Sequence, residues 1–159
     1  MKKILLGFLL LISIMSFGQV KREQIIDEKI GKINFKYIKI INIEKNEVSY
    51  LVYLGFQNEK YKSITDTKSI GFFDKESLNE FNKDLNTVKT QMLLKEKVSI
   101  SWNRSLYNLT LYDFSFALYL ENVKGVKGYT TLNVDEVNKL IENISKIDFG
   151  KDGLLVETN

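Results

Sequence analysis

Carboxylates are the side chains best suited to catalysis in this sequence, because its 159 residues include no His and no Cys. Without imidazole and thiol groups there can be no Ser-His-Asp or Cys-His machinery, no thiolate or imidazole zinc site and no histidine switch near neutral pH. Two carboxylates alone can hydrolyse a glycosidic bond when they lie about 5–9.5 Å apart in a cleft. The acids available for such a pair are Asp66, Asp74, Asp113, Glu121 and Asp135.

Each of these acids also has a simpler interpretation. Asp74 stands directly before an expected helix, where its side-chain oxygen would accept the unpaired N–H groups of the first turn. The other acids lie in or beside expected turns, where Asp is common. We therefore expect no catalytic residue, no metal ligand and no cofactor. A small carboxylate-dependent secreted hydrolase remains the alternative to a non-catalytic binding function.

Hydroxyl and amide side chains alternate with apolar ones in the second half of the chain, as in a strand with one buried face. Val98, Ile100 and Trp102 would face the core, and the residues between them would face outward. Such an uncharged surface could bind a protein or a glycan through hydrogen bonds and tyrosine rings. A plain solvated face is the alternative, since antiparallel sheets commonly leave one side in water. The outward residues are Ser99, Ser101, Asn103, Asn108, Thr110, Tyr112 and Tyr119.

The corresponding face of the first half is apolar. Ile38, Ile40, Leu51 and Tyr53 would point outward from their strands, and together they are too apolar to be left in water. The segment 20–32, which carries three isoleucines, or another molecule should cover them. We expect the cover to come from within the chain.

The spacing of apolar residues predicts the elements that position these side chains. Residues 20–32 could form a short helix or a mobile lead-in, because Ile25, Ile26 and Ile30 recur at helical spacing. Strands are expected at 34–43, 48–57, 69–73, 98–103, 106–114, 116–122 and 129–132, and helices at 75–91 and 134–147.

The two halves of the chain match when the sequence is shifted by 59 residues without a gap. The shift carries the helix cap Asp74 to Asn133, and Tyr53 to Tyr112. It also carries the apolar stripe of the first helix onto that of the second. The stripes are Leu78, Phe81, Leu85 and Val88, and Val137, Leu140, Ile144 and Ile147.

This pattern predicts an α+β fold with a largely antiparallel sheet and two helices on one of its faces. The sheet and helices would be built from two pseudo-repeated, strand-rich units, each ending in a helix, at about 38–92 and 97–150. Residues 1–18 are expected to be a signal peptide, 19–32 a lead-in segment, and 33–159 a single domain.

Charge gives little support to electrostatic binding partners. Without Lys2 and Lys3 of the expected signal, 21 of the 23 basic side chains remain against 20 acidic ones, a net charge of +1. That balance does not favour nucleic acid or a membrane surface as a ligand. We therefore expect contact with the membrane only transiently, through the signal peptide.

The N-terminus has the three parts of a secretory signal peptide. Lys2 and Lys3 form a basic region, residues 4–15 are almost entirely apolar, and Ser16 and Gly18 are small residues at the positions that signal cleavage requires. The apolar stretch from Ile4 to Phe17 has 14 residues, fewer than the roughly 20 that span a bilayer. We therefore expect export to the periplasm or the extracellular space.

Cleavage between Gly18 and Gln19 would leave a mature chain that begins at Gln19. Intact mass after expression in an exporting host measures this directly, allowing for cyclisation of the new N-terminal Gln. A full-length product retained in the membrane would contradict the export hypothesis.

Overall fold

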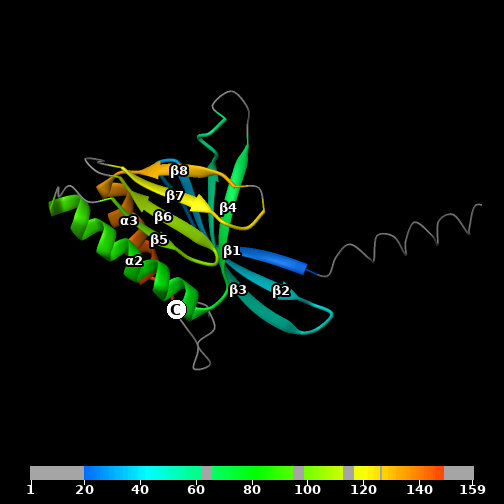
Figure 1. Ribbon diagram of the computed structural model, residues 1–159. Coiled ribbons are helices and arrows are strands. Elements are labelled where there is room, and N and C mark those ends of the chain that lie inside the picture. Colours follow the sequence, from blue (N-terminus) through cyan, green and yellow to red (C-terminus); the bar gives the residue numbers. More distant parts are fainter. Residues whose placement is uncertain (1–19, 62–65, 95–98, 113–116, 126, 149–159) are drawn as a thin grey trace, which may run out of the picture.

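The structure, a computed structural model, describes residues 20–61, 66–94, 99–112, 117–125 and 127–148. The expected signal peptide and its cleavage site lie outside these residues. The described strands form two four-stranded antiparallel sheets, each followed by a helix (Figure 1). This is an α+β fold, as the sequence predicts, but the strands fall into two sheets and not one.

The first sheet is a meander in which each strand pairs with the next in sequence. Its inner face is built by alternation, because Ile33, Phe35 and Tyr37 are buried while the residues between them point outward. The order is β1 (Val20–Ile30), β2 (Ile33–Asn42), β3 (Glu47–Gln57) and β4 (Thr67–Phe72). In Figure 1 the β2–β3 hairpin extends away from the helices.

The segment 20–32 was expected to form a short helix or a mobile lead-in. The helix prediction is wrong, because residues 20–30 form the edge strand β1 of the first sheet. The reason is a β-bulge, since the register of β1 against β2 shifts between Gln24 and Ile26. An extra residue breaks strict alternation. The adjacent Ile25 and Ile26 consequently imitate helical spacing, although Ile26 lies opposite Tyr37 in the ladder.

The second sheet has the same order of neighbours. Its inner face carries Leu109, Leu118, Leu120 and Leu132, which are fully buried. Trp102 packs against this core, as its alternation predicts. The strands are β5 (Ile100–Asn103), β6 (Tyr107–Leu111), β7 (Leu118–Asn122) and β8 (Tyr129–Leu132).

Both helices begin at a capping side chain. Before α2 (Lys75–Leu94), Asp74 accepts a hydrogen bond from the Ser77 N–H at 2.8 Å. Before α3 (Val134–Ser145), Asn133 and Glu136 form a reciprocal capping box. Both caps therefore satisfy N–H groups that have no partner within the helix.

The ungapped shift of 59 residues carries α3 onto α2 and β8 onto β4, but it does not match the earlier strands in their order within each sheet. Asp74 and Asn133 both cap a helix, and both apolar stripes are buried. However, Tyr53 lies in β3, the third strand of its sheet, while Tyr112 directly follows β6, the second strand of its own. At this offset β7 falls on residues 59–63, of which the described residues 59–61 are not in a strand.

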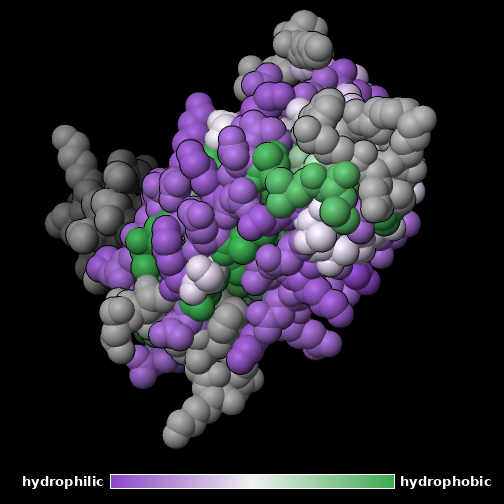
Figure 2. Space-filling view, turned by 90° about the vertical axis from the view of Figure 1, so that its left-hand side faces the viewer, coloured by the Kyte–Doolittle hydropathy of each residue, from purple (hydrophilic) through white to green (hydrophobic). Residues whose placement is uncertain are grey.

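One core joins both sheets and both helices. Phe81 of α2 stacks on Phe72 of β4 with ring centroids 5.0 Å apart, and meets Tyr107 of β6 edge-on at 4.8 Å. The two helices also pack against each other (Figure 1). On the side drawn in Figure 2, apolar patches are scattered among hydrophilic residues. Exposed apolar side chains include Leu93 and Leu94 at the end of α2.

An ion pair adjoins this core, with a buried carboxylate and an arginine side chain that is 33% exposed. Asp84 of α2 is 3% exposed, and Arg104, between β5 and β6, donates to both of its carboxylate oxygens at 2.8 Å. The Tyr107 hydroxyl donates to the same carboxylate at 3.0 Å. Burial and this hydrogen bond raise the pKa of Tyr107, so it remains a neutral donor. The cluster ties α2 to the β5–β6 hairpin.

Arg104→Met should lower the free energy of unfolding by about 3 kcal/mol, because it leaves the Asp84 carboxylate buried with Tyr107 as its remaining donor. The matched control is Arg22→Met, which removes the chain's other arginine, exposed on β1. That substitution should change stability by about ±0.5 kcal/mol. Urea unfolding measures both, and equal losses would contradict a structural role for the pair.

Candidate functional site

The structure brings the predicted polar residues together on one face of the second sheet. In the strand register Ser101 lies opposite Thr110, and Thr110 lies opposite Tyr119. Asn103 is likewise opposite Asn108. Ser99 directly precedes β5 and Tyr112 directly follows β6, and both are exposed.

Three tyrosines form a row across this face. The rings of Tyr112 and Tyr119 meet edge-to-face with centroids 5.0 Å apart and planes at 87°. Tyr119 then contacts Tyr129 of β8 at 5.6 Å. Tyr112 is 53% exposed, and the other two are half-buried. Contacts between neighbouring rings favour particular orientations, so the row offers a continuous aromatic surface.

Hydrogen bonds between side chains fix the polar groups beside these rings. Asn108 donates to Glu121 at 2.8 Å, and the hydroxyls of Ser101 and Thr110 lie 3.2 Å apart. Glu121 is directly opposite Tyr129 in the ladder. We call the surface formed by Ser101, Asn103, Asn108, Thr110, Tyr112, Tyr119, Glu121 and Tyr129 the tyrosine face.

Two members of the tyrosine face were missed by the sequence analysis. Glu121 was considered only as a catalytic acid, and Tyr129 only as part of a short strand. The alternation in β8 could have shown that Tyr129 and Thr131 share a face. Only the pairing of β7 with β8 places that face beside Tyr119.

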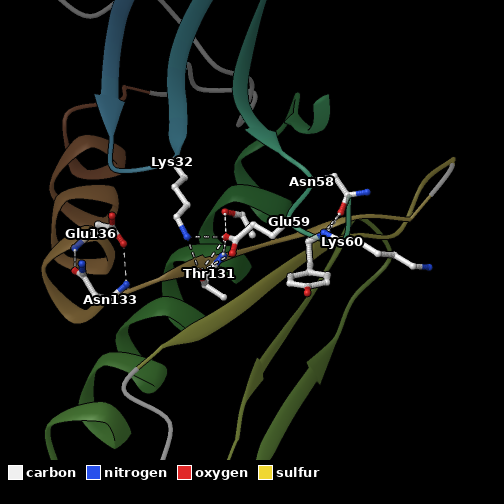
Figure 3. Close-up of polar contacts among 9 residues, drawn as sticks. Lys32, Asn58, Glu59, Lys60, Thr131, Asn133 and Glu136 are labelled. Carbon is white, nitrogen blue, oxygen red and sulfur yellow. Dashed lines mark hydrogen bonds and ion pairs between the residues drawn. The ribbon is translucent and has the colours of Figure 1, made fainter. Parts of the chain in front are cut away.

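The edge of β8 is held by Asn58 and Glu59, which directly follow β3, as Figure 3 shows. The Glu59 N–H donates to the Tyr129 carbonyl at 2.9 Å, and Asn58 Oδ1 accepts the Tyr129 N–H at 3.2 Å. Glu59 Oε1 accepts the Thr131 N–H at 2.7 Å. These contacts satisfy backbone groups of an edge strand, which would otherwise invite pairing with another chain.

The Glu59 carboxylate also accepts hydrogen bonds from side chains of both sheets. Its Oε1 atom lies 3.1 Å from Lys32 Nζ, in the β1–β2 turn, and 2.9 Å from the hydroxyls of Thr130 and Thr131. Burial alone would raise the pKa of Glu59, but the hydrogen bonds from Thr131, Lys32 and Thr130 outweigh it and lower the pKa. A carboxylate held in this way is suited to structure more than to proton transfer.

Two glycines allow this junction to close. A side chain at Gly31, whose φ is +56°, would overlap the Glu136 carboxylate of the α3 capping box. A Cβ at Gly128 would lie 2.6 Å from Asn58 Cγ and from Lys68 Cγ. Asn58 itself is fully buried and donates to Asp66 at 2.8 Å. The junction is therefore tightly packed on both sides.

The apolar face of the first sheet is not covered by residues 20–32, which corrects the expectation of cover from within that segment. Strand β1 lies beside β2 in the same sheet, so it extends the face at its edge. Ile38, Ile40, Leu51 and Tyr53 are half-buried and line a hollow of about 500 Å³.

Three of the acids proposed for a hydrolase have a local partner in the structure. Asp66 pairs with Lys68 at 2.8 Å, Asp74 caps α2, and Glu121 accepts from Asn108. Asp135 is exposed in the first turn of α3. Asp113 lies outside the described residues. Across the described ranges, no group of three or more Asp or Glu could hold a metal ion.

Comparison of the chain with known protein families, with curated proteins and with solved structures gave no match. Among the helices that the structure describes, none is long and apolar enough to cross a membrane. The functional argument therefore depends on the geometry of the tyrosine face.

Glu59→Gln should lower the free energy of unfolding at pH 7 by about 1–2 kcal/mol, because it removes the charge that Lys32 and the Thr131 N–H stabilise. A lowered pKa in the folded state means that this contribution is complete above the ordinary value of 4.5 and is lost as the pH falls through the folded-state pKa. The difference between wild type and variant should therefore shrink on acidification.

The control is Glu44→Gln, which removes an equal charge from the exposed β2–β3 turn and should change stability by about ±0.5 kcal/mol at pH 7. Urea unfolding at pH 7 and near pH 3 measures both variants. A Glu59 difference that is unchanged at low pH would contradict a stabilising carboxylate.

Proposed function

We propose that the protein is an exported, non-catalytic binding module that holds a protein or a glycan on its tyrosine face. The observation that carries the proposal is the row Tyr112–Tyr119–Tyr129, with hydroxyl and amide groups beside it. Tyrosine contributes large contact area at low entropic cost and retains a hydroxyl for hydrogen bonding. Rings that already contact one another lose less conformational freedom on binding than isolated rings do.

A protein partner has the more specific support of the two. Glu121 is the charged member of the tyrosine face and lies opposite Tyr129. An aromatic ring beside a carboxylate suits a Lys or Arg side chain, which the ring quadrupole and the carboxylate both attract. A glycan would use the same rings together with Asn103 and Thr110, so it remains the second ligand class.

The hydrolase reading has weaker support. The tyrosine face contains one carboxylate, and Glu121 is engaged by Asn108. A two-carboxylate mechanism needs a second acid across a cleft at a defined separation. The other described candidate acids have their own partners or are exposed at the surface.

We also infer that the two halves arose by duplication of one unit, with both helices on one face of the β layer. Support comes from the shared order of four successive antiparallel strands followed by a capped helix. By their order in the sheets, β4 corresponds to β8 and β3 corresponds to β7. Aligning the two halves of the sequence in this way requires a gap. In that arrangement β7 of the tyrosine face corresponds to β3, which carries Tyr53.

Tyr119→Ala should weaken partner binding at least tenfold, because Tyr119 is the central ring and contacts both others. The matched control is Tyr61→Ala, which removes a tyrosine that is 43% exposed outside this face. Partners would be trapped by cross-linking in the export compartment and glycans tested on an array, with affinities then measured by calorimetry.

Urea unfolding of the same variants keeps the result interpretable. Binding lost by Tyr119→Ala at retained stability, and kept by Tyr61→Ala, supports the proposal. Equal binding by wild type and Tyr119→Ala would assign the partner to another surface and overturn it.

A further inference from the structure

The hollow on the outer face of the first sheet has a shape set by strand register and by a glycine. Across β1, β2 and β3 it is lined by Arg22 and Gln24, by Ile38 and Ile40, and by Leu51, Tyr53 and Gly55. A Cβ at Gly55 would lie 2.6 Å from Cε1 of the Tyr53 ring. Because Gly55 has no side chain, the Tyr53 ring can lie against the backbone of β3 at this position.

The hollow has an apolar centre and a polar rim. Ile38 lies directly opposite Leu51 in the ladder, and Ile40 and Tyr53 flank this pair on the same face. Asn34, Lys36 and Thr67 are polar residues at its margin. A volume of about 500 Å³ and a mainly apolar lining with a few placed polar groups are typical of small-molecule sites.

The two cationic side chains at the rim, Lys36 and Arg22, differ in whether a carboxylate pairs with them. Lys36 Nζ is neutralised by Asp27 at 3.1 Å. Arg22 lies opposite Ile40 at the other end of the apolar centre, and within the described residues no carboxylate pairs with it. A guanidinium presents a planar fork of donors that matches a carboxylate or phosphate. The hollow therefore joins an apolar centre to Arg22, a cation that has no carboxylate partner in the part of the chain that the structure describes.

We propose that this hollow binds an amphipathic anion, an alkyl chain with a carboxylate or phosphate head group. The head group pairs with Arg22 on β1, and the chain lies across Ile40, Ile38 and Leu51 towards Tyr53 on β3. Crossing three adjacent strands covers about 10 Å, which suits a chain of medium length. The site lies on the first sheet, so it is separate from the tyrosine face and does not depend on its function.

Four probes with the same alkyl chain separate the contributions of chain and head group. Decanoate, decyl phosphate, decanol and decyltrimethylammonium are titrated into the mature protein by calorimetry, below their micelle concentrations. We expect both anions to bind, decanol to bind at least tenfold more weakly, and the cation to give no measurable heat. The stronger of the two anions identifies the head group.

Arg22→Gln should weaken the binding of the preferred anion at least tenfold, since a charge-assisted pair is lost. Lys45→Gln, in the exposed β2–β3 turn, removes the same charge elsewhere and should leave the affinity unchanged. Gly55→Ala should also weaken binding, because its methyl group displaces the Tyr53 ring into the hollow. Unfolding curves confirm that each variant is folded.

Three results would overturn the proposal. They are binding of decanol as tight as that of decanoate, an Arg22→Gln affinity equal to that of Lys45→Gln, or no binding of either anion. Sedimentation at increasing protein concentration completes the test. A dimer that forms while neither anion binds would assign the apolar face to a second copy of the chain and also overturn the proposal.

Discussion

Glu59 links the two sheets through hydrogen bonds that neither sheet could make alone. Its carboxylate accepts from Lys32 in the β1–β2 turn and from Thr131 on β8, which are 27 and 72 residues away in sequence. Its N–H also binds the carbonyl of Tyr129. Because β8 is an edge strand, these bonds occupy positions that a fifth strand would otherwise use. The tyrosine face therefore depends on Glu59 for the placement of its outermost ring.

Much of the fold could be predicted because its strands and helices have clear apolar periodicity. The strand at 129–132 was predicted with its observed bounds, and the starts of both helices followed from Asp74 and Asn133 as capping residues. Strand β1 could not be recognised, since its bulge places Ile25 and Ile26 side by side and disguises the alternation. Whether the strands form one sheet or two depends on which strands pair with each other. The periodicity of apolar residues within a strand does not specify its partners.

The polar face was also predictable in part, because alternation fixes which residues of a strand share a side. Ser101, Thr110 and Tyr119 indeed adjoin one another in the ladder. What the pattern could not supply were contacts between distant segments. Arg104 lies between two expected strands, and its partner Asp84 lies on the buried face of a helix, a position where sequence reasoning expects an apolar side chain.

The meander order of both sheets has a consequence for how the chain reaches this structure. Each strand pairs with its immediate neighbour in sequence, and the β1–β2 connection is only the two residues Gly31 and Lys32. Such pairings close short loops, which costs little entropy and favours rapid formation. The bonds from Asn58 and Glu59 to β8 span about seventy residues and close a much longer loop. Each sheet can therefore assemble locally first, leaving their docking as the step with the largest entropic cost.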